Sequence, residues 1–150
     1  MKLLAIDTTE DACSAALLID TEVTERFELA PRRHSEILLP MMDGLLRAAG
    51  LRLGDLDALA FARGPGSFTG VRIAVSVAQG AAFGAQLPVV PVSSLQALAQ
   101  GVRREHAVSA VLIALDARMH EVYWGGYRFL MIRRPPTSTL FPYTTLFRSK

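Results

Sequence analysis

The sequence contains a single cysteine, Cys13, among its 150 residues. One cysteine allows neither an intramolecular disulfide nor a zinc cluster, which suits a reducing compartment, so we expect a cytoplasmic protein. No His-x-x-x-His occurs, and His34, His106 and His120 are isolated from one another. We therefore expect no metal site, because these histidines supply no ligand set.

Charge is absent from residues 73–102. A membrane span is one interpretation of such a run, but polar and helix-breaking residues divide it into pieces too short to cross a bilayer. They are Gln79, Gly80, Gly84, Gln86, Pro88, Pro91, Ser93 and Ser94. We expect a buried helix, a turn and a buried strand there. The short apolar run at the N-terminus is interrupted by Asp7 before a signal peptide could form.

Acidic residues are missing from positions 129–150, which contain Arg133, Arg134, Arg148 and Lys150. The remaining chain has 12 basic and 14 acidic residues, a net charge of −2. The pI near 9.0 therefore comes from the end of the chain. Direct binding of RNA by a basic patch is not supported, because the arginines of the body are scattered.

Hydrophobic periodicity and turn residues predict the order of the elements. Strands are predicted at Lys2–Asp7, Cys13–Ile19, Glu22–Leu29, Leu56–Ala62, Pro88–Val92, Val108–Asp116 and Glu121–Tyr127. Helices are predicted at Ser35–Ala49, Thr69–Phe83 and Ser93–Arg104. A three-strand meander followed by alternating helices and strands is the order of an α/β fold of the actin-like, ribonuclease-H-like (ASKHA) type, with a mixed sheet and flanking helices.

Three segments follow from this order. Residues 1–107 are predicted to form a first actin-like domain, and residues 108–128 the start of a second, truncated one. Residues 129–150 have no acid and no regular period, and they resemble translated sequencing-adapter read-through. We interpret them as a non-native, disordered tail; a genuine Pro/Thr-rich tail is the alternative.

The glycine-rich run between the fourth strand and the second helix is the most informative stretch, and it consists of Gly64, Pro65, Gly66, Ser67, Phe68, Thr69 and Gly70. Such a loop directs backbone N–H groups at one point, where a phosphate or carboxylate can bind. The alternative is a tight strand-to-helix turn with Ser67 or Thr69 as the N-cap. No Gly-Lys-Ser/Thr is present, so this is not a P-loop.

Three segments resemble the signatures of the TsaB (YeaZ) family, namely Leu3–Thr9, Arg63–Arg72 and Ile113–Trp124. The resemblance covers roughly residues 1–128. It implies a non-catalytic partner subunit of the machinery that makes threonylcarbamoyladenosine in tRNA. The implied partners are a TsaD-like catalytic subunit and a TsaE-like ATPase, with a homodimer in their absence and tRNA bound only through the complex.

The same resemblance bears on catalysis. The catalytic relatives carry a metal-binding His-x-x-x-His on the helix after the short fifth strand, and Ser94 and Leu98 stand at those positions here. A hydroxyl and an isobutyl group cannot replace two imidazoles. We therefore expect no enzyme activity; an actin-like ATPase or a metallopeptidase-like enzyme is the alternative, and a direct tRNA-binding module a third. No cofactor is expected on this chain alone, and an adenine nucleotide at the partner interface stays open.

Two carboxylates are candidates for a cleft. Asp7 and Asp116 each end a strand, and in the implied fold both face the same cleft. The alternatives are that Asp7 and Thr9 hydrogen-bond their own turn, and that Asp116 pairs with Arg118 or with backbone.

A partner surface is predicted on two helices. The first is apolar over more than half its circumference, and the second has small residues every four positions, a spacing that lets another helix approach closely. The predicted contact residues are Leu38, Met42, Leu45, Gly70, Ala74, Ala78 and Ala82. The alternative is a thick internal core in an alanine-rich chain.

Overall fold

The computed structural model describes residues 1–129, which fall into two compact units. The first comprises Met1–Ser94, and the second begins at Leu95. Each unit has a hydrophobic cluster of its own.

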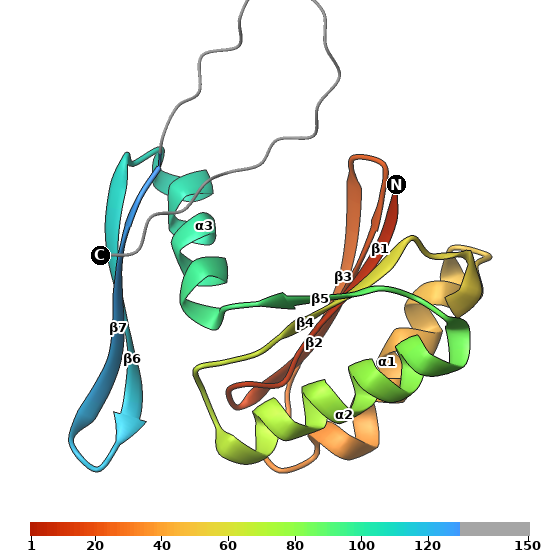
Figure 1. Ribbon diagram of the computed structural model, residues 1–150, viewed down its shortest axis with the longest axis horizontal. Helices are drawn as coiled ribbons and strands as arrows, with labels where there is room; N and C mark the ends of the chain where they lie inside the picture. Colours follow the sequence, from red (N-terminus) through yellow and green to blue (C-terminus); the bar gives the residue numbers. More distant parts are fainter. Residues whose placement is uncertain (130–150) are drawn as a thin grey trace, which may run out of the picture. The chain divides into compact units, whose positions relative to one another are not determined.

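The first unit is built on a five-stranded mixed sheet with the order β3-β2-β1-β4-β5 (Figure 1). Its strands are β1 (Lys2–Asp7), β2 (Ala12–Ile19), β3 (Glu22–Leu29), β4 (Ala58–Ala62) and β5 (Val89–Val92). The first three form an antiparallel meander, and β4 and β5 join β1 in parallel. The predicted mixed sheet of the ribonuclease-H-like type is confirmed.

Two helices share the core of this unit. Helices α1 (His34–Ala48) and α2 (Phe68–Ala85) lie on the same face of the sheet (Figure 1). Alternate residues of the sheet point at them, among them Leu4, Cys13 and Leu17, which are at most 2% exposed. The period of two in β1 and β2 thus gives one fully buried face.

Local signals account for most boundaries. Gly50 has φ +66 just after α1, as expected of a residue that ends a helix in the left-handed region. The fourth strand begins two residues later than predicted, because the chain forms the short helix η1 (Leu53–Asp55) just before it. The Asp55 carboxylate accepts the Arg52 N–H at 2.8 Å and holds that turn.

The edge strand β3 differs from expectation. Its alternation predicts a half-buried strand, but every residue from Glu22 to Leu29 is exposed. The strand pairs only with β2 among the described residues, and α1 makes far fewer contacts with it than with β2. Burial is lost at this edge because the helix layer is centred over the interior of the sheet.

The second unit contains α3 (Ser94–His106) from Leu95 onward and the antiparallel hairpin β6 (Ala110–Arg118) and β7 (Glu121–Arg128). Its hydrophobic cluster consists of Leu95, Ala99, Ile113, Tyr127 and Phe129. The units therefore divide at Ser94, not at residue 107 as predicted, since α3 supplies the apolar face that the hairpin needs.

The start of the predicted tail also shifts by one residue. Phe129 is 6% exposed, its N–H donates to the Ser109 carbonyl at 2.9 Å, and the Arg103 guanidinium lies 4.8 Å from its ring centre. Phe129 thus belongs to the second unit. The rest of the predicted tail, residues 130–150, lies outside the described residues.

Candidate functional site

The carboxyl ends of β1, β4 and β5 meet at one edge of the sheet, where parallel α/β sheets usually place their sites. Asp7 ends β1, and its Oδ1 accepts the Thr9 N–H at 2.8 Å and the Thr9 hydroxyl at 2.7 Å. Thr9 Oγ1 also lies 3.2 Å from Ser94 Oγ. Since the Thr9 proton is used on Asp7, the Ser94 hydroxyl is the donor.

These contacts join three residues in one chain, Asp7–Thr9–Ser94. Thr9 is 2% and Ser94 5% exposed, so the two hydroxyl groups satisfy each other away from water. The alternative in which Asp7 and Thr9 hydrogen-bond their own turn is therefore what the structure shows.

The glycine-rich loop lies directly on the end of β1. The Ser67 N–H donates to the Thr9 carbonyl at 2.6 Å, and the Thr8 hydroxyl donates to the Gly70 carbonyl at 2.7 Å. A Cβ on Gly66 would collide with the Thr9 backbone, and a Cβ on Gly70 would collide with the Thr8 carbonyl. Glycine is needed at both positions because two backbones touch there.

Several N–H groups of the loop are used within the chain. Ser67 is the N-cap of α2, with its Oγ accepting the Gly70 N–H at 3.4 Å, and the Val71 N–H donates to the Ser67 carbonyl at 2.8 Å. Ser67 is thus the cap, as one alternative predicted, and Thr69 is not. The binding of a phosphate by Gly64, Gly66, Ser67, Phe68, Thr69 and Gly70 stays a prediction.

The two candidate carboxylates belong to different units. Asp7 lies in the first unit and Asp116, on β6, in the second, so their approach to each other stays a prediction. Among the described residues, no three His, Cys, Asp or Glu side chains gather where a metal ion could bind. Ser94 is buried in the polar chain described above, and Leu98 is 44% exposed on α3.

The predicted partner residues require a correction. All seven are buried within the first unit: Leu38, Met42, Leu45, Gly70, Ala74, Ala78 and Ala82. The small side chains of α2 let that helix approach the sheet of its own chain, rather than a helix of another molecule. These residues are therefore not available as contacts, and the internal-core alternative was the correct one.

Sequence reasoning missed Thr8. Its side chain is fully buried and holds the first turn of α2 to the end of β1. The signal was the four-residue spacing of Gly66 and Gly70, which indicates two close approaches to one neighbouring strand. His34 lies at the start of α1 and is 8% exposed, and its Nε2 has no hydrogen-bond partner among residues 1–129.

No helix of residues 1–129 is long and apolar enough to span a membrane. The class of protein follows from the fold together with a family match. Residues 22–134 match the family described as TsaD, tRNA N6-adenosine threonylcarbamoyltransferase. With the sheet order β3-β2-β1-β4-β5 and the helices on it, this defines a TsaD-like domain of the ribonuclease-H-like class.

Individual relatives narrow the class. The chain is 52% identical over 128 residues to the tRNA threonylcarbamoyladenosine biosynthesis protein TsaB of Escherichia coli, covering 85% of this chain and 55% of the relative. It is 54% identical over 124 residues to TsaB of Haemophilus influenzae, covering 83% of this chain and 52% of the relative. A solved structure of YeaZ from Pseudomonas aeruginosa superposes with a TM-score of 0.83 at 52% identity, covering 87% of this chain and 61% of that one.

The chain belongs to the TsaB (YeaZ) family. It spans about half the length of the curated relatives it matches.

Proposed function

We propose that this chain acts in tRNA threonylcarbamoyladenosine biosynthesis as a non-catalytic partner subunit that supports a TsaD-like catalytic subunit. The observation that carries the proposal is the environment of the Ser94 side chain. Ser94 stands where the catalytic relatives are expected to hold a metal ligand, and its hydroxyl is instead buried in a hydrogen bond to Thr9. The second such position is Leu98, which has no ligand atom.

The polar chain at the sheet edge supports a structural role for Asp7. A carboxylate that positions a metal or a phosphate needs its oxygens directed at the ligand, whereas Asp7 Oδ1 accepts two bonds from Thr9. No glycine is available in the turn Thr8–Asp11 to wrap a phosphate. We therefore assign Asp7 to fixing the turn and not to turnover.

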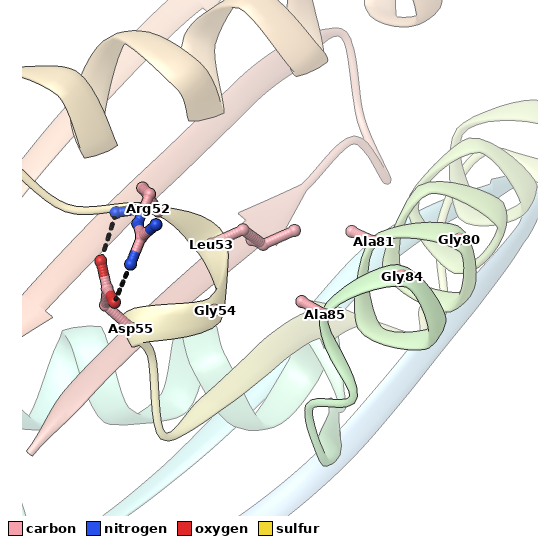
Figure 2. Close-up of a pocket in the computed structure, with 8 residues that line it drawn as sticks. All are labelled: Arg52, Leu53, Gly54, Asp55, Gly80, Ala81, Gly84 and Ala85. Atoms are coloured by element: carbon pink, nitrogen blue, oxygen red, sulfur yellow. Dashed lines mark hydrogen bonds and ion pairs between the residues drawn. The ribbon is translucent and has the colours of Figure 1, made fainter.

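A partner surface on the outer side of α2 replaces the one predicted from the sequence. Phe83, on the last turn of α2, is 90% exposed. An open groove of about 630 Å³ lies between the same end of α2 and η1 (Figure 2). Gly80, Ala81, Gly84 and Ala85 form the α2 side, and a Cβ on either glycine would meet nothing within 4 Å. Small residues let a helix of the catalytic subunit pack closely in this groove, and the exposed Phe83 ring beside them is the anchoring contact.

Within the assembly, a TsaE-like ATPase joins the pair, and tRNA is bound through the complex as a whole. In the absence of these partners, the same α2 surface forms a homodimer. We further propose that an adenine nucleotide binds at the partner interface. The complex is proposed to act in the cytoplasm. The body charge of −2 argues against a separate tRNA-binding function.

Reconstitution with and without this chain tests the role. A TsaD-like and a TsaE-like subunit should modify tRNA only when the chain is added, and the chain alone should release no phosphate from ATP. The Asp7→Ala substitution should lower the stability of the chain, and the folded variant should still support tRNA modification. Robust ATP turnover by the isolated chain, abolished by Asp7→Ala, would establish the alternative enzyme.

The surface has a test of its own. Phe83→Arg should abolish co-purification with a TsaD-like subunit while leaving the melting temperature unchanged, because the side chain is exposed. Met119→Arg is the matched control, since Met119 is 92% exposed on the second unit. Retained co-purification of Phe83→Arg would remove the α2 surface from the proposal but leave the reconstitution result standing.

A further inference from the structure

The edge strand β3 combines exposed apolar side chains with an unpaired backbone. Val23 is 58%, Phe27 62% and Leu29 70% exposed on this strand. Proteins usually shorten or interrupt such edges, whereas β3 runs without a bulge opposite β2 over eight residues. A regular edge of this kind is a surface to which an extended segment of another protein adds as a further strand.

The backbone register of β3 shows which groups are available to such a segment. The Ala30 N–H donates to the Asp11 carbonyl at 3.1 Å and continues the register in which Leu29 lies opposite Ala12. Even-numbered residues of β3 therefore direct their N–H and C=O toward β2, and odd-numbered residues direct theirs away from the sheet. No strand of residues 1–129 pairs with that outer side.

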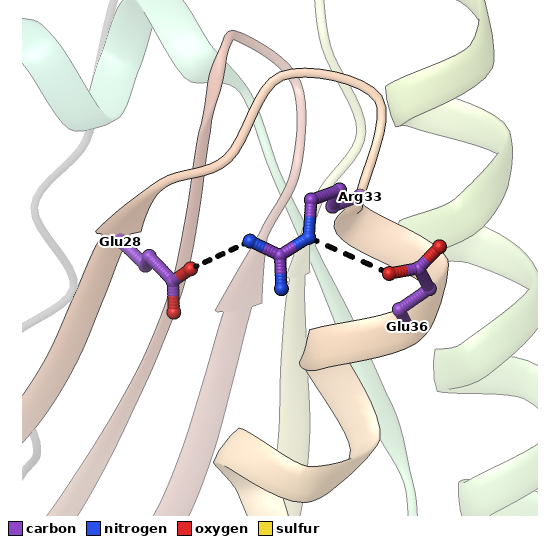
Figure 3. Close-up of polar contacts among 3 residues, drawn as sticks. All are labelled: Glu28, Arg33 and Glu36. Carbon is purple, nitrogen blue, oxygen red and sulfur yellow. Dashed lines mark hydrogen bonds and ion pairs between the residues drawn. The ribbon is translucent and has the colours of Figure 1, made fainter.

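The side chains of β3 divide between the two faces of the sheet. Arg26 lies on the helix side, because its Nη2 donates to the Gly44 carbonyl of α1 at 3.3 Å. Glu28 lies on the same side, with its Oε1 3.4 Å from Nη1 of Arg33 (Figure 3). The apolar side chains on the opposite face are those of Val23, Phe27 and Leu29. An added strand therefore meets charged side chains on one face and apolar side chains on the other.

A groove of about 600 Å³ lies between β3 and α1, on the helix side of this edge. Its lining includes the apolar Ile37, Pro40 and Met41 and the charged Glu25, Arg26, Glu28 and Glu36. Because three carboxylates outnumber one guanidinium, the groove is acidic. An apolar floor with acidic groups around it suits long basic side chains, whose aliphatic stems cover apolar surface while their charged ends stay in water.

Arg33 shows that a guanidinium fits between two of these carboxylates. Its Nη1 lies 3.4 Å from Glu28 Oε1, and its Nε lies 3.4 Å from Glu36 Oε2 (Figure 3). Both contacts are long, and all three side chains are at least 49% exposed, so these ion pairs are weak. Each pair uses one oxygen of its carboxylate, and the second oxygen can accept from an incoming cation.

We propose that β3 and this groove bind an extended segment of another protein, in which basic residues alternate with apolar ones, as an added antiparallel strand. The backbone of the segment pairs with the outward N–H and C=O groups of β3, in the orientation that β3 already shares with β2. Its apolar side chains lie against Phe27 and Leu29. Its basic side chains extend over Ile37 toward Glu28 and Glu36. This partner is additional to those of the proposed function, since it leaves the α2 surface free.

Charge complementarity selects a basic segment of another protein as the occupant. The strand β3 is itself acidic, with Glu22, Glu25 and Glu28 against Arg26. A second copy of β3 would therefore bring carboxylates to an edge that already has an excess of them. A nucleic-acid backbone is excluded for the same reason.

Two fluorescein-labelled peptides test the charge selection on the full 150-residue chain. The basic probe is Val-Arg-Val-Thr-Lys-Thr-Val with blocked ends. In the antiparallel register its first and third residues, both valine, lie opposite Leu29 and Phe27. Its arginine lies opposite Glu28 and its lysine opposite Glu25. The acidic probe, Val-Glu-Val-Thr-Glu-Thr-Val, is the matched control. Fluorescence anisotropy should show the basic probe binding at least about tenfold more tightly, and added salt should reduce the difference.

Substitutions in β3 test the charge and the backbone separately. Glu28→Arg should weaken binding of the basic probe about tenfold, and the exchanged peptide Val-Glu-Val-Thr-Lys-Thr-Val should restore it. Glu25→Pro removes an outward N–H that β2 does not use, so the chain should stay folded while the basic probe no longer binds. Glu25→Thr keeps that N–H and should bind the basic probe at least about fivefold more tightly than Glu25→Pro does.

Equal binding of the basic and acidic probes, or binding of neither, would overturn the proposal. So would a Glu25→Pro chain that melts normally and binds the basic probe as tightly as the unsubstituted chain. If Glu25→Pro fails to fold, the exchange at Glu28 decides, because Glu28 is exposed: unchanged binding by Glu28→Arg would overturn the proposal. Phe83→Arg should bind the basic probe normally, so this result and the test of the α2 surface are independent of each other.

Discussion

The Thr8 carbonyl occupies the space that a side chain at Gly70 would need, and the Thr8 hydroxyl donates to the Gly70 carbonyl at 2.7 Å. The last residues of β1 and the first turn of α2 are thus in direct backbone contact. The glycine-rich loop is built for this contact, whatever it binds.

Because of this contact, adding a single methyl group at Gly70 should lower the stability of the fold. Gly70→Ala should lower the free energy of unfolding by ~3 kcal/mol, near the upper end for an overpacked site, because the collision involves backbone that cannot turn away. Gly84→Ala is the control, since its Cβ would meet nothing within 4 Å. It should stabilise α2 by up to ~1 kcal/mol. Urea unfolding of both variants measures the difference, and equal effects would contradict the close approach.

The second prediction concerns the contribution of the Thr9 hydroxyl to stability. Thr9→Val keeps the shape but removes the hydroxyl that links Asp7 to Ser94, so a buried Ser94 donor loses its acceptor. We expect a loss of ~1–3 kcal/mol in thermal or urea unfolding. Thr69→Val, at an exposed threonine of the glycine-rich loop, should change stability by less than ~0.5 kcal/mol. A neutral Thr9→Val would mean that water replaces the hydroxyl.

Ala78 separates an internal core from a partner surface. Its side chain is fully buried in the same cluster as Leu4 and Leu59. Ala78→Arg should therefore destabilise the monomer by ~3–5 kcal/mol, as an unpaired buried charge does. The exposed neighbour Gln79 should tolerate arginine. Circular dichroism on heating tests this pair, and a folded Ala78→Arg chain that merely fails to associate would reinstate the predicted surface.

Asp55 makes stability depend on pH. Its pKa lies below the ordinary value, chiefly because its carboxylate accepts the Arg52 backbone N–H at 2.8 Å. A lowered folded-state pKa stabilises the fold above the unfolded-state pKa, and this contribution is lost as the pH falls through the folded-state value. Asp55→Asn should therefore lower the melting temperature at pH 7, and the difference should shrink steadily below pH ~4. A difference that stays constant down to pH 2 would assign the effect to the amide and not to the charge.

The sequence by itself determined the order of the elements, the strand faces of β1 and β2, the end of α1 at Gly50 and the loop that starts α2. These features depend on neighbours along the chain: a period of two, a left-handed glycine, a serine cap. Family membership followed from three such local segments. In each case the physical cause lies within a few residues of its effect.

Tertiary structure alone decided which face of α2 is inside. The helix is apolar on almost every side, so its sequence permits Ile73, Val77 and Ala81 to face the sheet as readily as Ala74, Ala78 and Ala82. The second set is buried, because the backbone contact between Thr8 and Gly70 fixes the rotation of α2 at its first turn. The exposure of β3 and the assignment of α3 to the hairpin were decided in the same way, by how much apolar area each neighbouring layer could cover.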